Sequence, residues 1–504
     1  MRILEKNPKL GYDKILDALR VGDLLVSHSI KDPNKKIEFL SHSSLQIEQN
    51  ALFFCKGARF REEYLDEAIK KGAICYMAEQ KFAPKDCDHI IVGDIYRAMA
   101  LVAPLYYGYP HKNLFLSGVT GTKGKTTTTH FLKNIFDAHA KTQTGLLSSI
   151  ETYTGKRRDE SHNSTPEPCD LQRFFYEAVE SGIKYFSMEV SSQAYKAHRV
   201  DDITFDNGIF LNFSEDHISP IEHEDIEDYL CCKLEFMKNC SNIVINCETD
   251  CFDRVLAAAK SSKTLKQITL FGSEKSKGLC DYYYSEIRKE GSNQSFILKN
   301  DKTGYMAKFS VSIPGRFNIE NAAAAATLSK TLNIGDEDIR AGLLQTQMPG
   351  RMNIFENNGI TVIVDYAHNL LSFTRLYESL KQDYPGQRII SLGGAPGEKA
   401  YRRRKDFADV VGGSSDFVYL TAEDPQFENV EEICAAIAAH MMDTPYEIIP
   451  NRAEAVKKAI QNAKPGDVVV LLAKGEEDYQ KVRGKYEFYE SDLKLAESIL
   501  FEKI

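Results

Sequence analysis

A glycine-rich segment carries the clearest chemical signal in the sequence. It reads GVTGTKGKTT from Gly118 to Thr127, between an apolar run and a helical pattern. Its glycines let backbone N–H groups surround phosphate oxygens, the helix start adds partial positive charge, and Lys125 can reach the terminal phosphates. The G-x5-G-K-T spacing from Gly118 is one residue off the usual one, so the alternative is an ordinary glycine-rich turn, but the flanking strand and helix favour nucleotide binding. The predicted ATP contacts are Gly121, Thr122, Lys123, Gly124, Lys125, Thr126 and Thr127.

Two further polar segments come directly after apolar runs that we expect to be strands. Glu189 lies at the end of the run that begins at Tyr185, and Asn212–His217 follows the run that begins at Ile209. Ligand sites of α/β proteins form at such strand ends, and carboxylate oxygens suit Mg²⁺. Each segment on its own is more simply interpreted as a capping or surface loop.

Three later segments complete an ordered set of motifs. They are PGRFNIEN at residues 314–321, PGR at 349–351 and VDYAHN at 364–369. Together with the earlier segments, and in this order, they resemble the motifs of the Mur ligase family of ATP-dependent amide-forming enzymes. The resemblance covers nearly the whole chain from Ser43 onward. It implies that ATP activates a carboxylate as an acyl phosphate, which an amine then attacks, with ATP and Mg²⁺ as cofactors.

Smaller segments resemble one branch of that family. They are NSTP at residues 163–166, Arg199 after the Ser-Ser pair, and YLCCK at 229–233. This branch adds a third amino acid to the D-glutamate of UDP-N-acetylmuramoyl-L-alanyl-D-glutamate in peptidoglycan precursor synthesis. The resemblance implies that Lys233 carries a carbamate, an anionic oxygen ligand that helps to hold a second Mg²⁺. From the residues alone, Lys233 is one lysine on an amphipathic helix, and a solvated charge is the simplest interpretation.

The resemblance also implies roles for residues spread along the chain. The implied catalytic residues are Lys125, Glu189, His217 and Lys233, and the implied metal environment is Thr126, Glu189, His217 and Lys233. Further contacts to adenosine and phosphates are implied for Asn318, Asn321, Arg351, Asp365 and His368. Contacts to the UDP substrate are implied for Ser43, Asn163, Ser164, Thr165, Ser191 and Arg199.

The substrate-recognition segments depart from the family pattern. Only Ser43 is kept from an Asp-Ser-Arg motif, and Ala197 stands where a glutamine often precedes His-Arg. In the motif EDPQ, Gln426 replaces the arginine that pairs with the distal carboxylate of meso-diaminopimelate in family members using that substrate. We therefore expect L-lysine, or L-ornithine, as the added amino acid, although Lys399 or Arg404 could still hold a carboxylate. The implied amino-acid contacts are Lys399, Arg404, Glu423, Asp424, Gln426 and Glu477.

Short apolar strands separated by helical segments must position these residues. The pattern is typical of mostly parallel sheets covered by helices on both faces. The alanine run at residues 322–326 predicts a tightly packed helix. The expected strands include Leu114–Leu116, Tyr185–Val190, Ile209–Asn212, Ile243–Ile245, Thr361–Val364, Ile389–Leu392, Phe417–Leu420 and Val468–Leu472.

Breaks in the pattern divide the chain into three predicted α/β domains. A chain of 504 residues is long enough for about three domains. Breaker residues occur around Pro110 and Pro349. We predict a mixed α/β UDP-binding domain at residues 1–112, a P-loop ATPase domain with a mostly parallel sheet at 113–347, and a Rossmann-like amino-acid-binding domain at 348–504.

Composition places the chain among globular proteins. Apolar residues make up 43 % and charged residues 27 %, and the net charge is -9, which argues against a nucleic-acid partner. No apolar run is long enough to span a bilayer, and the charged N-terminus lacks a signal-peptide core. The eleven cysteines are scattered, as expected for reduced thiols. We expect a cytoplasmic monomer acting on small molecules, without membrane insertion.

Three other interpretations compete with this one. The nearest is another ligase of the same superfamily, of the folylpolyglutamate or dipeptide-adding type; the first is disfavoured by the roughly 112 residues before the glycine-rich segment. A catalytically silent ATP-binding partner is disfavoured because Lys125, Glu189 and Lys233 are all present. A P-loop kinase or GTPase would need a guanine-specificity motif or phosphoacceptor site, neither of which is found in the sequence.

Overall fold

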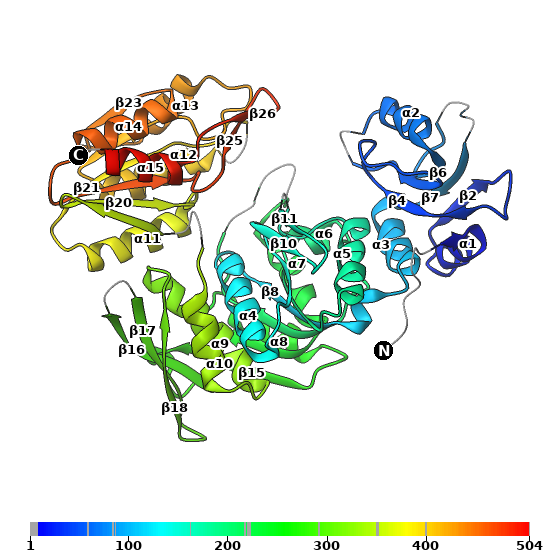
Figure 1. Cartoon of the computed structure of the whole chain (residues 1–504), viewed down its shortest axis with the longest axis horizontal. Helices are drawn as coiled ribbons and strands as arrows, with labels where there is room; N and C mark the ends of the chain where they lie inside the picture. Colours follow the sequence, from blue (N-terminus) through cyan, green and yellow to red (C-terminus); the bar gives the residue numbers. More distant parts are fainter. Residues whose placement is uncertain are drawn as a thin grey trace.

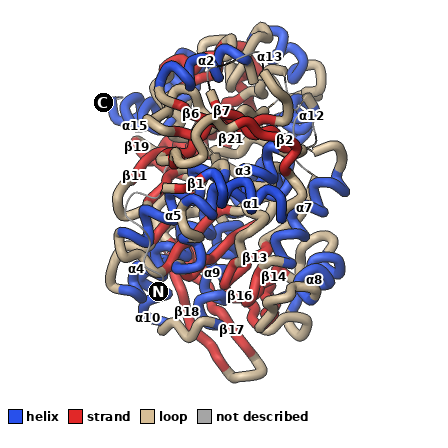
Figure 2. Tube along the Cα trace, turned by 90° about the vertical axis from the view of Figure 1, so that its right-hand side faces the viewer, coloured by secondary structure: helices blue, strands red, loops and turns tan. Residues whose placement is uncertain are grey.

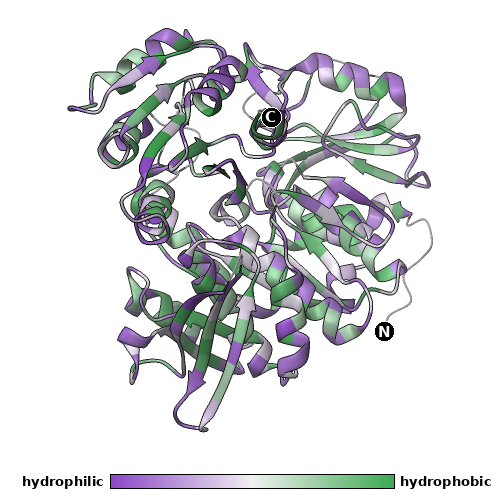
Figure 3. Cartoon of the chain, turned by 60° about the vertical axis from the view of Figure 1, so that its left-hand side comes forward, coloured by the Kyte–Doolittle hydropathy of each residue, from purple (hydrophilic) through white to green (hydrophobic). Residues whose placement is uncertain are grey.

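The chain folds into three α/β units in the computed structural model (Figure 1). The structure describes residues 9–57, 60–82, 85, 87–161, 163–215, 218, 223–290, 293–348, 352–398 and 401–502. The N-terminal and C-terminal sheets lie at separate sides of the central sheet, as Figure 1 shows. Hydrophobic residues concentrate on the strands inside each unit and hydrophilic residues on the outward helix faces (Figure 3).

The N-terminal unit is a mixed five-stranded sheet with strand order β2-β7-β6-β5-β4. Strands β4 to β7 are parallel, and β2 is antiparallel to β7. Its strands are β2 (Leu25–Ser29), β4 (Phe39–Ser41), β5 (Ala51–Phe54), β6 (Ala73–Ala78) and β7 (Asp88–Val92), beside a small pair of β1 (Leu10–Gly11) and β3 (Lys36–Ile37). Its helices are α1 (Tyr12–Val21), α2 (Glu62–Lys71) and α3 (Ile95–Tyr106).

The central unit is built on an eleven-stranded sheet whose middle is parallel. Its parallel strands, in spatial order, are β9 (Gly145–Leu147), β12 (Tyr185–Glu189), β8 (Phe115–Thr120), β13 (Phe205–Phe210), β14 (Cys240–Asn246), β15 (Gln267–Ser273) and β16 (Tyr282–Glu290). Antiparallel strands extend both edges: β10 (Glu151–Tyr153) and β11 (Arg158–Glu160) on one side, β17 (Asn293–Asn300) and β18 (Tyr305–Val311) on the other.

Helices cover both faces of the central sheet (Figure 2). Successive apolar side chains point to opposite faces of a strand, so Leu116 of β8 packs into one core and Val119 into the other. One face carries α5 (Pro168–Glu180), α7 (Ile226–Lys238) and α8 (Phe252–Lys260), with the short α6 (Ser192–Lys196) beside them. The other carries α4 (Lys125–Ala140), α9 (Arg316–Thr331) and α10 (Asp336–Gln345). Short turns η1 (Pro110–Asn113) and η2 (Glu274–Ser276) complete this unit.

The C-terminal unit is a six-stranded sheet with strand order β19-β20-β24-β21-β22-β23. All neighbouring strands are parallel except β19, which is antiparallel to β20. Its strands are β19 (Asn353–Asn357), β20 (Ile360–Asp365), β21 (Arg388–Gly393), β22 (Phe417–Leu420), β23 (Tyr446–Ile448) and β24 (Asp467–Leu472), followed by the hairpin β25 (Tyr479–Val482) and β26 (Lys485–Phe488). Its helices are α11 (Leu370–Asp383), α12 (Arg402–Asp406), the π-helical turn η3 (Phe407–Gly412), α13 (Val430–Ala438), α14 (Arg452–Asn462) and α15 (Asp492–Glu502).

The predicted α/β class with mostly parallel sheets is confirmed. The eight expected apolar runs all overlap strands, and the alanine run at residues 322–326 lies in α9, fully buried against the sheet. Alanine fits there because its small side chain lets the helix approach the strands closely. The strands β16–β18, which pair with one another in antiparallel fashion, were not expected, because their alternating polar residues form no apolar run. Within the described residues, no helix has the length and apolar character needed to cross a membrane.

Candidate active site

A cleft of about 430 Å³ brings together residues of the central and C-terminal units. The central sheet contributes the loops after β8 and β12, together with parts of α7 and α9. The C-terminal unit contributes the end of β20 and the start of α11. The cleft thus lies at the carboxyl ends of parallel strands, where α/β folds bind ligands.

The glycine-rich loop is fixed by its neighbours in the shape that its sequence predicts. Gly124 has a φ of +85°, and a Cβ atom there would lie 2.2 Å from the Asn321 side-chain oxygen, so glycine is required. The backbone N–H of Thr122 donates to the Asn212 carbonyl at 2.9 Å, and that of Lys123 donates to the Asn212 side-chain oxygen at 2.9 Å. Helix α4 begins at Lys125, which places a helix N-terminus at the cleft. Thr126 and Thr127 also line the cleft.

Lys233 is buried, so its interpretation as a solvated charge is wrong. Only 1 % of the residue is exposed, because α7 packs this side against the glycine-rich loop. Its Nζ donates to the Gly121 carbonyl at 2.9 Å and lies 4.7 Å from the centre of the Tyr229 ring. Lys125 Nζ donates to the same carbonyl at 2.9 Å. The loop therefore holds two cationic side chains close to where phosphates would lie.

Oxygen atoms suited to a divalent cation gather beside these lysines. Thr126 Oγ1 lies 3.0 Å from Ser149 Oγ, and a Glu189 oxygen accepts the Ser149 backbone N–H at 2.6 Å. Glu189 is nearly fully buried at the end of β12, and all three residues line the cleft. Hydroxyl and carboxylate oxygens are the donors that Mg²⁺ prefers, so this set fits the ion. The predicted ligand His217 lies outside the described residues.

Helix α9 supplies two buried asparagines on the opposite side of the loop. Asn318 donates its amide to the Pro314 carbonyl at 2.6 Å, and Asn321 donates to the Asn318 side-chain oxygen at 3.2 Å. The Asn321 side-chain oxygen is buried at the cleft, and no described residue donates a hydrogen bond to it. A buried acceptor without a donor is costly, which favours a ligand donor there.

The C-terminal unit contributes two further predicted residues, Asp365 and His368. Asp365 accepts backbone N–H groups of Met352 and Ala367, each at 2.8 Å, which fixes its carboxylate at the end of β20. His368 Nδ1 lies 2.8 Å from the Tyr366 carbonyl. Both residues line the cleft, whereas the predicted Arg351 lies outside the described residues.

Unpartnered polar atoms mark the wall formed after β12. Ser191 Oγ, Gln193 Nε2 and Arg199 Nε are buried there, each without a hydrogen-bond partner among the described residues. Arg199 is oriented by the Thr165 carbonyl at 2.9 Å and by an ion pair with Glu167 at 2.8 Å.

The other predicted UDP-substrate residues are divided between this wall and the N-terminal unit. Thr165 supports the wall from behind, accepting the Ser191 N–H at 3.1 Å and donating to the Glu189 carbonyl at 3.0 Å. Asn163 and Ser164 line the cleft. Ser43 lies elsewhere, in the loop that follows β4 of the N-terminal sheet.

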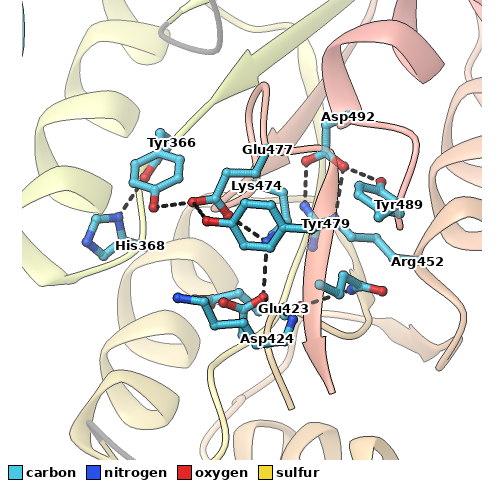
Figure 4. A network of polar contacts seen from close by, with 12 residues as sticks. Tyr366, His368, Glu423, Asp424, Arg452, Lys474, Glu477, Tyr479, Tyr489 and Asp492 are labelled. Atoms are coloured by element: carbon cyan, nitrogen blue, oxygen red, sulfur yellow. Dashed lines mark hydrogen bonds and ion pairs between the residues drawn. The ribbon is translucent and has the colours of Figure 1, made fainter. Parts of the chain in front are cut away.

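Three of the predicted amino-acid residues, Glu423, Asp424 and Glu477, lie at a second polar network in the C-terminal unit (Figure 4). At its centre the fully buried Lys474 donates to Asp424 at 3.0 Å and to Glu477 at 2.5 Å. Tyr366, which also lines the cleft, donates its hydroxyl to Glu477 at 2.8 Å. The network thus connects the cleft with the EDPQ motif. Asp424 and Glu477 thus share the single positive charge of Lys474.

Glu423 of the same motif lies in a desolvated position. Burial raises its pKa to about 7, although the nearby Arg403 opposes that shift. Arg404 is mostly buried and pairs with Glu428 at 2.7 Å. The Gln426 backbone bonds to residues 481 and 483 of the β25 hairpin region, at 2.9 and 2.7 Å. The predicted Lys399 lies outside the described residues.

Several residues of the site carry no signal in the sequence. Ser149, Ser192, Tyr229 and Tyr366 reach the cleft from loops and helices that are distant in the chain. Arg375 also reaches it and pairs with Glu320 of α9 at 3.6 Å, across the two units. Ser192, Tyr229 and Tyr366 fall within quoted motifs, but in each motif the function was assigned to a neighbouring residue.

Comparisons with known families match most of the chain. Residues 119–329 match the Mur ligase middle domain, and residues 350–475 match the Mur ligase glutamate ligase domain. A UDP-N-acetylmuramyl-tripeptide synthetase of Lactobacillus delbrueckii subsp. bulgaricus is 37 % identical over 503 residues, covering 96 % of this chain and 97 % of the relative.

A lysine-adding relative and a solved structure are similar over the same length. A UDP-N-acetylmuramoyl-L-alanyl-D-glutamate--L-lysine ligase of Enterococcus faecalis is 39 % identical over 475 residues, covering 93 % of this chain and 92 % of the relative. A solved structure of a UDP-N-acetylmuramoyl-L-alanyl-D-glutamate--2,6-diaminopimelate ligase gives a TM-score of 0.65 at 19 % identity, covering 98 % of this chain and 99 % of that one. At this identity the likeness concerns the fold alone.

Proposed function

The chain belongs to the Mur ligase family, and from this premise we propose that it adds L-lysine to the D-glutamate of UDP-N-acetylmuramoyl-L-alanyl-D-glutamate in peptidoglycan precursor synthesis. Membership of the family makes it an ATP-dependent, ADP-forming amide ligase. The dipeptide substrate and the lysine are inferences from the named relatives and from the residues of the site.

The observation that carries this proposal is the composition of the cleft. Lys125, Glu189 and Lys233 of the central unit face the same cavity as Asp365 and His368 of the C-terminal unit. One ATP molecule held by both units would place its γ-phosphate beside the two lysines. The unpartnered atoms of Ser191 and Arg199 on the adjoining wall then suit a polar, anionic second substrate.

In the proposed reaction, the D-glutamate carboxylate attacks the γ-phosphorus of ATP, forming an acyl phosphate and releasing ADP. The amine of lysine then attacks the acyl carbon and phosphate leaves. Lys125 and the N-terminus of α4 would stabilise the charge on the transferred phosphoryl group. Asn318, Asn321, Arg351, Asp365 and His368 would bind the remainder of ATP.

The oxygen donors around Ser149 fit a magnesium ion. Bound Mg²⁺ neutralises phosphate charge during phosphoryl transfer. We propose that Thr126, Glu189 and His217 hold it, with a second ion held by a carbamate on Lys233. The buried position of Lys233 at the Gly121 carbonyl supports this role, because a carbamate on its Nζ would lie beside the loop that we expect to bind the phosphates.

The three units would divide the substrates among them. We propose that residues 1–112 bind the UDP moiety through Ser43, and that Asn163, Ser164, Thr165, Ser191 and Arg199 bind the muramoyl dipeptide. Residues 113–347 would bind ATP, and residues 348–504 would bind the amino acid through Lys399, Arg404, Glu423, Asp424, Gln426 and Glu477. We further propose that the enzyme works as a cytoplasmic monomer.

Within the EDPQ region, Glu423 is the acidic group best placed to recognise a lysine side chain. Asp424 and Glu477 both already accept a hydrogen bond from the buried ammonium of Lys474, so these two acids would shape the pocket. The relatives named L-lysine ligases support this assignment of the amino acid.

The proposal is tested by ADP and phosphate release with UDP-N-acetylmuramoyl-L-alanyl-D-glutamate and each of L-lysine, L-ornithine and meso-diaminopimelate. We expect turnover that requires both substrates and Mg²⁺, with L-lysine preferred. The Lys125→Ala variant should fold but lose turnover by about a hundredfold or more, since it removes a charge that stabilises the transition state. Turnover with a folate or a tripeptide acceptor, and none with this dipeptide, would contradict the proposal.

A further inference from the structure

A chain of hydrogen bonds runs from the cleft into the protein and has no role in the reaction as described so far. Ser192 lines the cleft, and its Oγ lies 2.8 Å from Nε2 of the fully buried His223. His223 Nδ1 lies 3.0 Å from a carboxylate oxygen of Asp228. Lys196 forms an ion pair with the same oxygen. The three groups reproduce the hydroxyl, imidazole and carboxylate order that activates hydroxyl groups in other enzymes.

The ionisation of the Asp228 carboxylate determines which atoms of this hydrogen-bond chain carry protons. Burial tends to raise the pKa of Asp228, but hydrogen bonds from Lys196 and His223 outweigh burial and lower it to about 2. An ionised carboxylate only accepts hydrogen bonds, so Nδ1 of His223 carries a proton and donates it. In a neutral imidazole Nε2 is then an acceptor, and the Ser192 hydroxyl donates to it. The lone pairs of Ser192 Oγ are consequently left to accept from a donor in the cleft.

The surroundings of His223 favour a role in proton transfer over a role as a metal ligand. Ligand atoms of His223, Asp228 and Cys232 lie within 4.8 Å of one another. The ammonium group of Lys196 is already paired with Asp228, so a divalent cation there would meet a fixed positive charge. The Tyr229 ring, 5.1 Å away between centroids, covers one side of the imidazole. Among the described residues, the Cys232 thiol, 3.8 Å from Asp228, and the backbone N–H of Glu224 also contact the Asp228 carboxylate.

We propose that Ser192, held by His223 and Asp228, takes the proton from the amine that attacks the acyl phosphate. This inference rests on the proposed ligase reaction and adds the base that reaction requires. An amine that has bonded to carbon must lose a proton before the amide is stable. Ser192 shares the cleft with Lys125 and Arg199, which flank the place where the acyl phosphate would form.

The step balances within these groups. The neutral amine forms the new C–N bond, and the carbonyl π electrons move to oxygen. One N–H proton passes to Ser192 Oγ as the Ser192 proton passes to His223 Nε2, which leaves an imidazolium beside the Asp228 carboxylate. The tetrahedral intermediate then collapses, the bond from carbon to the phosphate oxygen breaks, and phosphate leaves. The imidazolium returns its extra proton through Ser192 to the departing phosphate or to water.

Contacts between two helices also connect the hydrogen bonds of Ser192, His223 and Asp228 with the rest of the site. Helix α6 begins at Ser192, and its Lys196 is paired with Asp228 of α7, the helix that carries Lys233. Ser192 is therefore held relative to the phosphate-binding lysines by side chains on both helices. Ser192 is the catalytic residue in this proposal, while His223 and Asp228 are positioning residues that accept and stabilise its proton.

The test separates the two chemical steps in the Ser192→Ala enzyme. Acyl phosphate formation is followed without lysine, by scrambling of ¹⁸O from the β,γ-bridge of ATP in the presence of the UDP-muramoyl dipeptide. Amide formation is followed with lysine present. We expect the scrambling rate to be unchanged and the rate of amide formation to fall by about a hundredfold or more, as for loss of general-base catalysis. Equal losses in both steps, or no loss in either, would overturn the proposal.

The His223→Gln variant distinguishes proton transfer from simple orientation of the hydroxyl. A glutamine oxygen can accept the Ser192 hydrogen bond but cannot take up its proton. We expect this variant to behave as Ser192→Ala does; full amide formation would mean that Ser192 is only oriented. Ser187→Ala, a buried hydroxyl on β12 without a partner among the described residues, is the matched control and should leave both rates unchanged. A wild-type enzyme inactive towards the dipeptide would instead contradict the proposed function.

Discussion

Lys125 and Lys233 donate to one and the same backbone oxygen, the carbonyl of Gly121, each at 2.9 Å. They come from different helices, α4 and α7, and more than a hundred residues separate them in the chain. Two like charges at one carbonyl repel each other unless anions balance them. Bound phosphate supplies such balance, and conversion of Lys233 to a carbamate would reverse the sign of one of the two charges.

The first prediction concerns that carbamate. Lys233→Ala should reduce ligation by about a hundredfold or more, because it removes a proposed ligand of the metal that neutralises phosphate charge. Short carboxylic acids added to the buffer should restore part of the activity by supplying the missing anionic oxygens. Activity is measured as ADP release.

The control for this prediction is Lys238→Ala, at the last residue of α7. Lys238 is exposed and pairs with Glu235 at 2.5 Å, so its loss should leave ADP release unchanged. A Lys233→Ala enzyme with full activity, or one insensitive to carboxylic acids, would count against the carbamate. ¹³C-labelled carbon dioxide gives a direct readout, since the carbamate carbon should appear in the spectrum of the wild type alone.

The second prediction concerns the stability of the C-terminal unit. Lys474→Met leaves Asp424 and Glu477 without their buried cation, which should lower the free energy of unfolding of this unit by about 3 kcal/mol. Urea denaturation followed by circular dichroism measures the loss. Lys458→Met removes an exposed, solvent-screened ion pair with Glu447 and should leave the free energy of unfolding almost unchanged. Similar effects of the two substitutions would contradict the structural role assigned to Lys474.

The parallel strands and the nucleotide loop could be predicted because their signals are local. An apolar run indicates a buried strand. At Gly124 the positive φ that the loop needs is indicated in the sequence by the glycine itself. The burial of Lys233 could not be predicted from its own neighbourhood, because an amphipathic helix looks the same whether its polar side faces solvent or a phosphate loop. Only the resemblance to a family gave that lysine a role.

Contacts between residues that are distant in the chain could not be predicted from the sequence. The family resemblance assigned Asp424 and Glu477 to the added amino acid, and the structure places the protein's own Lys474 between them. Nothing at Lys474 itself indicates which acids it will meet. The chain from Ser192 through His223 to Asp228 is equally invisible, because it joins two helices and a loop whose packing is decided by the whole core.

The third prediction concerns the pH dependence of lysine recognition. Burial raises the pKa of Glu423 to about 7, and only its ionised form attracts the lysine side-chain ammonium. The KM for L-lysine should therefore fall as the pH rises through about 7, with a slope of at most about tenfold per pH unit below it. In Glu423→Gln the KM should be higher and this dependence absent. A wild-type KM that is constant from pH 6 to pH 8 would contradict the role of Glu423.

The same group makes a contribution to stability with a defined sign. Because its folded-state pKa is higher than its ordinary value of 4.5, the folded protein binds this proton more tightly than the unfolded chain does. The stabilisation is complete below about pH 4.5 and is lost as the pH rises through about 7. Glu423→Gln should remove this part of the pH dependence of urea unfolding.

The last prediction concerns the choice between L-lysine and meso-diaminopimelate. Gln426 carries no charge, so it cannot form the paired hydrogen bonds by which an arginine holds a distal carboxylate. Its backbone is fixed by hydrogen bonds to the β25 hairpin region, so a substitution there should change the side chain without moving the loop. We expect kcat/KM for L-lysine to exceed that for meso-diaminopimelate by about a hundredfold, because the extra carboxylate would be desolvated beside Glu423 without a partner. Gln426→Arg should reduce this ratio of kcat/KM values about tenfold, mainly by raising kcat/KM for meso-diaminopimelate. Gln387→Arg adds the same charge at an exposed position in the turn before β21 and should leave the ratio unchanged. A wild-type preference for meso-diaminopimelate would show that another cation, Lys399 or Arg404, has taken over the missing contact.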